Sequence, residues 1–167
     1  EHPWQLSPVL SAYTDSDFVG CVASRRSTSG GVVLLGTHLL KHWASTQKKI
    51  TLSSGEAELG AVVRGFSEVL GIQSVARDLG VELQPEVHAD SSAAIGICRR
   101  CGIGKVRHLA VAQLWVQDLV RSKACRLYKV LGTENPADLM TKPLPRVEID
   151  SHLERLGLSR ATGRAET

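Results

Sequence analysis

Residues 30–45 read GGVVLLGTHLLKHWAS, and this stretch sets the fold of the first part of the chain. Two runs of strand-forming residues, 30–35 and 39–45, flank the short Gly36-Thr37-His38 segment, which predicts an antiparallel hairpin. Residues 9–15 (VLSAYTD) predict a further strand before it. The first 45 residues or so therefore favour three strands joined by turns.

Beyond the hairpin, the hydrophobic spacing changes from the period of strands to that of helices. Apolar residues recur at intervals of three and four positions, which predicts long amphipathic helices. The resulting order favours an α/β domain with a mixed five-stranded sheet, in which three antiparallel strands are followed by parallel crossovers and flanked by helices. The predicted elements after the hairpin are a helix at 53–79, a strand at 86–90, helices at 91–98 and 105–122, a strand at 125–131 and a helix from Pro136.

Composition is that of a single globular domain. The chain has 167 residues, 43% of them hydrophobic, and a formal net charge of +3, which excludes intrinsic disorder and permits a polyanionic partner. No apolar run approaches the roughly 20 residues needed to span a bilayer, so no membrane partner is expected. Met140 is the only methionine, so we expect the sequence to be part of a longer chain.

Four carboxylates fall at the ends of predicted elements or on an apolar helix edge. Asp15 closes the first strand, Glu58 lies in the first turns of the long helix, Asp90 closes the fourth strand and Asp138 lies in the first turn of the last helix. If they converge, they form an oxygen-rich site suited to Mg²⁺. Three of the four also have a structural explanation: a turn residue for Asp15, a helix cap for Asp90 and a favourable interaction with the helix dipole for Asp138.

Two neighbouring acids compete for these roles. Asp17 competes with Asp15, which we favour because it directly continues the strand whereas Asp17 should already point into the turn. Glu56 lies three residues after Ser53, the spacing of a capping box. Glu58 instead shares a helix face with apolar residues, which points it toward the sheet.

Several segments match, in order, the ribonuclease H region at the C-terminal end of copia-type retrotransposon polyproteins. The resemblance covers roughly residues 12–158. The matching segments are Tyr13-Thr14-Asp15-Ser16-Asp17, Arg26-Ser27-Thr28-Ser29-Gly30, Trp43-Ala44-Ser45, Ser53-Ser54-Gly55-Glu56-Ala57-Glu58-Leu59, His88-Ala89-Asp90-Ser91, Asn135-Pro136-Ala137-Asp138 and Thr141-Lys142-Pro143-Leu144.

The resemblance implies a ribonuclease H-like fold whose second strand runs against the other four. It also implies hydrolysis of the RNA strand of RNA–DNA hybrids during reverse transcription. The family's four acids fall on Asp15, Glu58, Asp90 and Asp138. They would hold two Mg²⁺ ions ~3.5–4 Å apart, which Mn²⁺ can replace. We expect Asp15 to bridge the ions, Glu58 and Asp90 to lie on one side and Asp138 on the other.

The same resemblance suggests the surroundings of the domain. Residues 1–8 would be a linker from the upstream polyprotein, 9–145 the ribonuclease H-like domain, and 146–167 a loosely attached amphipathic segment with a polar tail. The expected partners are the hybrid and the upstream reverse transcriptase domain. The expected location is the cytoplasm, within virus-like particles, with the nucleus as an alternative.

Substrate contacts are predicted from basic and polar residues near these motifs. Lysine and arginine contacts to phosphates fix register without reading sequence, although a solvated charged face explains any one of them equally well. Ser91 is a candidate for contact with a 2′-hydroxyl, the group that separates RNA from DNA. The further candidates are Arg25, Arg26, Lys48, Lys49, Arg107 and His108.

The chain departs from the family's pattern in one helix, and two other functions compete with the first. The helix that usually begins Lys-His-Ile-Asp in the family reads Arg107-His108-Leu109-Ala110 here, which puts contacts made by that helix in doubt. The main alternative function is a ribonuclease H fold without turnover, acting as a binding or tethering module for a reverse transcriptase or a host. An integrase, which shares the fold, is disfavoured by the Asp–Glu–Asp–Asp order of the acids.

Overall fold

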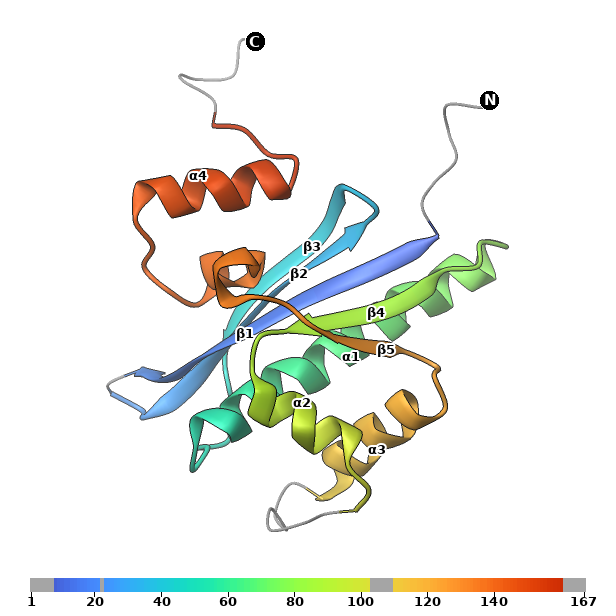
Figure 1. Ribbon diagram of the computed structural model, residues 1–167, viewed down its shortest axis with the longest axis horizontal. Coiled ribbons are helices and arrows are strands. Elements are labelled where there is room, and N and C mark those ends of the chain that lie inside the picture. Colours follow the sequence, from blue (N-terminus) through green and yellow to red (C-terminus); the bar gives the residue numbers. More distant parts are fainter. Residues whose placement is uncertain (1–7, 22, 103–109, 161–167) are drawn as a thin grey trace.

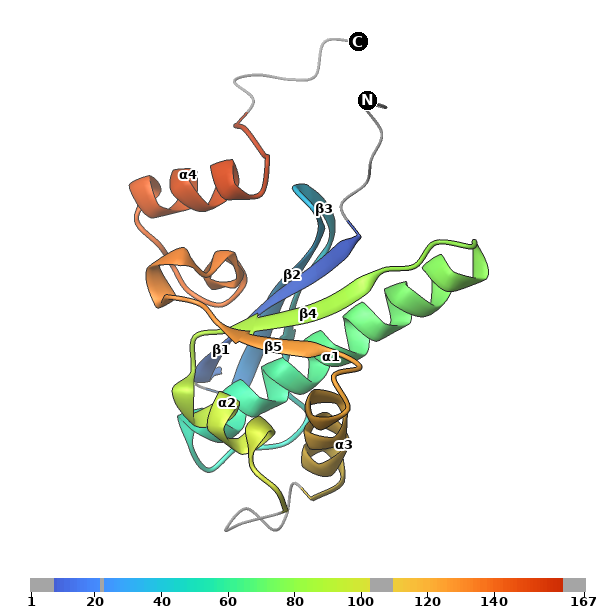
Figure 2. The ribbon, with the colours of Figure 1, turned by 45° about the vertical axis from the view of Figure 1, so that its right-hand side comes forward.

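A twisted five-stranded sheet with helices on both faces forms the body of the molecule (Figures 1 and 2). The computed structural model describes residues 8–21, 23–102 and 110–160. The strands are β1 (Val9–Cys21), β2 (Arg26–Leu35), β3 (His38–Thr46), β4 (Gln84–Ala89) and β5 (Arg126–Lys129). The helices are α1 (Ser54–Asp78), α2 (Ser92–Arg99), α3 (Ala110–Arg121) and α4 (Arg146–Arg155), with the 3-10 helices η2 (Gly132–Glu134) and η3 (Pro136–Met140).

The strand order across the sheet is β3-β2-β1-β4-β5. β2 is antiparallel to both of its neighbours, whereas β1 pairs in parallel with β4, and β4 in parallel with β5. The predicted mixed sheet, with a second strand that runs against the other four, is therefore confirmed. β1 is the central strand, so residues on it meet elements from both halves of the chain.

Helix α1 covers one face of the sheet and buries the apolar stripe that predicted it. Side chains alternate along a strand, so Leu10, Ala12 and Thr14 of β1 point to the same face. Gly65 of α1 lies against this face, where a Cβ would come within 2.5 Å of Thr14 Cγ2. Phe66, fully buried, packs beside it. α1 therefore approaches β1 closely near its middle.

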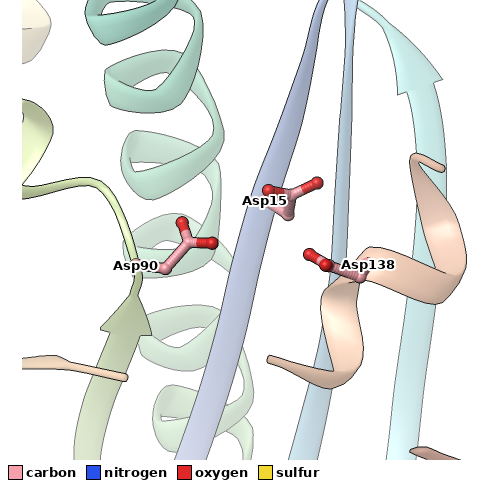
Figure 3. A group of neighbouring side chains, drawn as sticks. All are labelled: Asp15, Asp90 and Asp138. Carbon is pink, nitrogen blue, oxygen red and sulfur yellow. The ribbon is translucent and has the colours of Figure 1, made fainter. Parts of the chain in front are cut away.

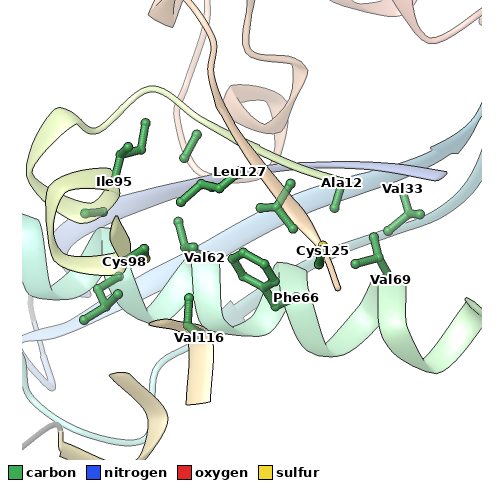
Figure 4. Close-up of a cluster of buried hydrophobic side chains, with 14 of the residues drawn as sticks. Ala12, Val33, Val62, Phe66, Val69, Ile95, Cys98, Val116, Cys125 and Leu127 are labelled. Atoms are coloured by element: carbon green, nitrogen blue, oxygen red, sulfur yellow. The ribbon is translucent and has the colours of Figure 1, made fainter. Parts of the chain in front are cut away.

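A single large core joins the two halves of the chain behind the sheet (Figure 4). It brings together side chains from the sheet and from α1, α2 and α3, which lie on the same side in Figures 1 and 2. Because this core is contiguous, the positions of the strand ends above it are fixed relative to one another. Its members include Ala12, Val33, Val62, Phe66, Val69, Ile95, Cys98, Val116, Cys125 and Leu127.

The N-terminus of α1 agrees in part with the predicted capping box. The Ser53 side chain accepts a hydrogen bond from the Glu56 backbone N–H, as expected. The Glu56 carboxylate, however, accepts from the Leu52 backbone N–H at 2.9 Å rather than from that of Ser53. Glu56 is thus engaged at the start of the helix, which leaves Glu58 as the acid on the sheet side.

The first strand is longer than predicted. Asp15 does not close β1, because the strand continues to Cys21. Asp17 does not yet point into a turn either: it lies opposite Thr28 of β2, and Ser16 opposite Ser29. The antiparallel partner keeps this polar stretch extended, although its residue types alone favour a turn.

The C-terminal part also differs from expectation. The helix that follows Asn135 is a 3-10 helix of five residues, η3, although the Asn cap and the Pro at its start are as predicted. The segment after Pro145 is not loosely attached, because it forms α4 and continues into Leu156, only 3% exposed, which packs on Val32 and Leu34. Within the described part of the chain, no helix combines the length and the apolar character that crossing a membrane requires.

Candidate metal centre

Three aspartates from three separate elements point toward one another (Figure 3). Asp15 lies on β1, Asp90 directly follows β4, and Asp138 lies in η3. One carboxylate oxygen from each lies within 4.8 Å of those of the other two. The structure thus brings together three of the four acids that the sequence singled out.

The register of the parallel strands explains why Asp15 and Asp90 meet. Thr14 of β1 lies opposite Ala89, the last residue of β4, so the next residue on each strand is an aspartate. The chain then turns at Ser91, whose side chain caps α2 by accepting from the Ala94 backbone N–H. The position of Asp90 is therefore fixed on one side by the pairing of β4 with β1 and on the other by the cap of α2.

Asn135 attaches the third aspartate to the sheet. Its side-chain amide donates to the Thr14 carbonyl at 3.0 Å, and its side-chain carbonyl accepts from the Ala137 backbone N–H. Asn135 is fully buried, so both bonds are shielded from water. The start of η3, and with it Asp138, is consequently tied to β1 beside Asp15.

A glycine lets η3 lie close to the strands. Gly30 of β2 pairs with Asp15. A Cβ on Gly30 would lie 2.6 Å from both Met140 Cβ and Thr141 Cγ2, distances that real Cβ atoms do not show. The missing side chain therefore makes room for the end of η3 on the face of the sheet that carries Asp15.

Glu58 lies beside the three aspartates rather than among them. It does not belong to the group with mutual oxygen distances under 4.8 Å. Burial, together with the charges of Asp15 and Asp90, raises the pKa of Glu58 to about 8, against a hydrogen bond from the Ser16 backbone. Its Oε2 atom is buried and has no hydrogen-bond partner among the described residues. Glu58 thus has a buried oxygen without a partner and feels the negative charges of Asp15 and Asp90.

Thr141 and Lys142, which directly follow η3, both contact Asp15. Thr141 Oγ1 donates to Asp15 Oδ2. Lys142 Nζ lies 3.1 Å from Asp15 Oδ1 and 3.0 Å from Asp138 Oδ1, so one ammonium bridges two of the three carboxylates. Sequence reasoning missed both residues as parts of the site. The spacing of four between Asp138 and Lys142 was the available signal.

The electrostatics of the site favour a cation. Burial raises the pKa of Asp138 to about 6, and burial together with the charge of Asp15 raises the pKa of Asp90. These carboxyl groups therefore hold their protons more tightly than usual, because burial and the neighbouring negative charges both disfavour the ionised form. Oxygen donors of this kind suit hard divalent cations such as Mg²⁺. The residues present fit a divalent metal ion.

None of the predicted substrate contacts within the described residues belongs to the group of three aspartates. Arg25 and Arg26 are exposed at the turn between β1 and β2. Lys48 and Lys49 are exposed after β3 and line a cavity of about 460 Å³ between β3 and α1. Ser91, next to Asp90, is the candidate nearest the carboxylates in sequence, but its hydroxyl is engaged as a helix cap. The two remaining candidates, Arg107 and His108, lie outside the described residues.

Comparison with known proteins shows what the chain is similar to. No family model matches the chain. It is 32% identical over 152 residues to the Retrovirus-related Pol polyprotein from transposon RE2 of Arabidopsis thaliana, covering 89% of this chain and 10% of that protein. It is 28% identical over 153 residues to the corresponding polyprotein from transposon TNT 1-94 of Nicotiana tabacum, covering 90% and 12%. The chain is a homologue of copia-type Pol polyproteins. The chain therefore spans 10% to 12% of the length of these relatives.

Solved structures show the fold of this chain. LC11-RNase H1, isolated from compost, superposes with a TM-score of 0.60 at 16% sequence identity, covering 80% of this chain and 92% of that one. A second structure of LC11-RNase H1, in complex with an RNA/DNA hybrid, superposes with a TM-score of 0.54 at 17% identity, covering 78% and 92%. The chain has the ribonuclease H fold, as the motifs predicted.

Proposed function

We propose that this chain is a metal-dependent ribonuclease H that hydrolyses the RNA strand of an RNA–DNA hybrid. The hybrid would be made by a reverse transcriptase domain elsewhere in the same polyprotein. The observation that carries the proposal is the convergence of Asp15, Asp90 and Asp138 from three elements onto one point. The ribonuclease H fold, the Pol relatives and the hybrid bound by LC11-RNase H1 support it.

Four acids would divide the work of holding the metal. Asp15, which is 1% exposed, would hold the metal together with Asp90 and Asp138, because one oxygen of each lies within 4.8 Å of those of the other two. Asp90 and Asp138 would act on either side of it, and Glu58 would turn its uncommitted Oε2 toward the side of Asp90. When bound, divalent ions supply a water of lowered pKa and a charge clamp on the phosphate oxygens.

The rest of the chain positions these acids. Asn135 fixes the start of η3 to β1, and Gly30 lets its end lie over β2. Burial of Asp15 among hydrogen-bonded neighbours restricts its rotamers before any substrate arrives, and such preorganisation favours catalysis. Outside the centre, Arg25, Arg26, Lys48 and Lys49 would contact phosphates, and backbone or hydroxyl groups near Ser91 would contact a 2′-hydroxyl.

A cleavage assay with the parent chain and two variants tests the proposal. The substrates are one end-labelled RNA paired with DNA and the same RNA paired with RNA, each with Mg²⁺. We expect the parent chain to cut only the hybrid, and Asp90→Asn to lose activity by about a hundredfold or more. Asp118→Asn removes an exposed acid that pairs with Arg121 on α3, so it should cut like the parent.

The other outcomes are equally informative. Cleavage that persists unchanged in Asp90→Asn would remove the carboxylate centre from the mechanism. A parent chain that binds the hybrid without cutting it under Mg²⁺ or Mn²⁺ would favour the binding or tethering module instead.

A further inference from the structure

We propose that the ammonium group of Lys142 is a built-in counter-ion that occupies the carboxylate site of the metal-free protein and must leave it before a divalent cation binds. This inference rests on the proposed function and deepens it, because it assigns an intramolecular competitor to the metal. It concerns a residue that would not itself be a metal ligand.

The contacts of Lys142 place its charge where a metal ion would act. Its Nζ lies 3.1 Å from Asp15 Oδ1 and 3.0 Å from Asp138 Oδ1. Both oxygens belong to the cluster of Asp15, Asp90 and Asp138 carboxylates. Mg²⁺ binds carboxylate oxygens at ~2.0–2.1 Å, so an ion held by these carboxylates lies next to the ammonium group and is repelled by it. The two cations therefore compete for the same carboxylates.

The remaining oxygen of Asp15 is occupied as well. Thr141 Oγ1 donates to Asp15 Oδ2, so both oxygens of this buried aspartate have donors from adjacent residues of the chain. Each carboxylate oxygen has two lone pairs, so a metal ion can share an oxygen of Asp15 with a hydrogen-bond donor. The neutral hydroxyl of Thr141 is compatible with such an ion, whereas divalent charge repels the ammonium group of Lys142. Lys142 is thus the donor that must leave.

Lys142 has a route out of the site. Its side chain is 39% exposed, while that of Asp15 is 1% exposed, so the ammonium reaches inward from the surface. Lysine has a flexible four-carbon stem and a compact head, so it can withdraw into solvent without backbone movement. An arginine fork would hold the two carboxylates more rigidly. The residue type therefore suits an occupant that leaves.

The charge of the site explains why an occupant is needed. The carboxylates of Asp15, Asp90 and Asp138 lie together, and Glu58 lies beside them. The ammonium group of Lys142 brings a positive charge into contact with two of these carboxylates. Without metal, this charge offsets the repulsion that would otherwise push the aspartates apart.

Manganese titration followed by electron paramagnetic resonance tests the competition, because the signal of free aqueous Mn²⁺ counts unbound ions. We expect Lys142→Met to bind Mn²⁺ about tenfold more tightly than the parent, since a charge some 3–4 Å from the ligands is removed. Lys41→Met is the matched control. It removes a lysine paired with Glu68 on the edge of the sheet and should bind Mn²⁺ like the parent.

The outcomes separate this inference from the proposed function. Equal affinities for the parent and Lys142→Met would leave the metal site in place and overturn the counter-ion. An equal gain in Lys41→Met would reduce the effect to net charge and overturn it too. If neither the parent nor Lys142→Met binds Mn²⁺, the metal site and the proposed function fail together. Binding by Lys142→Met alone would support the counter-ion strongly.

A second measurement needs no charge-removing variant, in case Lys142→Met does not fold. In protein with ¹⁵N-labelled lysine, ammonium groups held in ion pairs give observable NMR signals. Lys142→Arg identifies the Lys142 signal by its loss. We expect Mg²⁺ saturation to shift or abolish that signal and to leave the signal of Lys41, which pairs with Glu68, unchanged. A Lys142 signal unaffected by saturating Mg²⁺ would contradict the proposal.

Discussion

At the scale of single residues, Glu58 couples the stability of the metal-free protein to pH. Its pKa rises from an ordinary value of 4.5 to about 8 in the fold. Between these values the folded protein keeps a proton that the unfolded chain has lost. Stability therefore falls as pH rises through this window. Below this window the Glu58 carboxyl group is protonated in both the folded and the unfolded protein, so no stability is lost there.

Glu58→Gln should remove most of that dependence, because glutamine imitates the protonated acid. We expect the free energy of unfolding of the metal-free parent to fall by roughly 3–5 kcal/mol between pH 5 and pH 8, and that of the variant by less. Asp138, with a pKa of about 6, leaves a smaller decrease in both. Urea unfolding at three pH values in the presence of a chelator measures the difference. Identical slopes for the two proteins would exclude Glu58 as the cause.

The individual acids were predictable because each breaks a pattern. Asp15 and Asp90 follow strand-forming runs, and Glu58 stands on an apolar helix edge. Sequence could not show that Glu58 lies beside the cluster rather than inside it, since that depends on distances between separate elements. Nor did the sequence single out Lys142, because its role depends on contacts with Asp15 and Asp138, which lie 127 and 4 residues away in the chain.

At the scale of elements, the closeness of η3 to β2 positions Asp138. Gly30→Ala would place a methyl group 2.6 Å from Met140 Cβ and Thr141 Cγ2, so η3 would have to move. We expect a loss of stability of about 1–3 kcal/mol and weaker Mn²⁺ binding. Gly71→Ala in α1 is the control, because nothing lies within 4 Å of the added methyl group. It should raise stability slightly. Chemical unfolding and Mn²⁺ titration report both effects, and unchanged Mn²⁺ affinity in Gly30→Ala would show that η3 does not set the site.

Asn135 is the second device that holds η3. Asn135→Ala removes its bonds to the Thr14 carbonyl and the Ala137 N–H, and leaves these groups buried without partners. We expect a loss of about 2–4 kcal/mol in the free energy of unfolding, which thermal unfolding would reveal as a lower Tm. A loss below about 0.5 kcal/mol would mean that water replaces the bonds and that Asn135 is not an anchor.

Element types were largely predictable, and element lengths were not. Periodicity identified α1, which has 25 residues, and two strand-forming runs on either side of a short glycine-containing turn identified the hairpin of β2 and β3. The extension of β1 through Asp15-Ser16-Asp17 depends instead on pairing with β2, which local residue types do not encode. The same holds for η3, whose short 3-10 geometry follows from its contacts with β1 and β2.

At the scale of the whole molecule, the C-terminal segment contributes to a second small core. Leu156 packs on Val32 and Leu34, on the face of the sheet opposite α1. Leu156→Ala should cost about 2–4 kcal/mol of stability, because it leaves a cavity against two buried strand residues. Leu158→Ala, at a position 43% exposed, should cost little. Thermal unfolding compares the two, and equal shifts would show that α4 adds no core.

The central claim concerns the whole arrangement: a fold that brings Asp15, Asp90 and Asp138 together to hold divalent metal ions. Crystals soaked in Mn²⁺ and measured at a wavelength where manganese scatters anomalously test it most directly. The account predicts anomalous density in contact with all three carboxylates and the ammonium of Lys142 withdrawn from Asp15. Saturating Mn²⁺ that leaves no anomalous density among these carboxylates would contradict it.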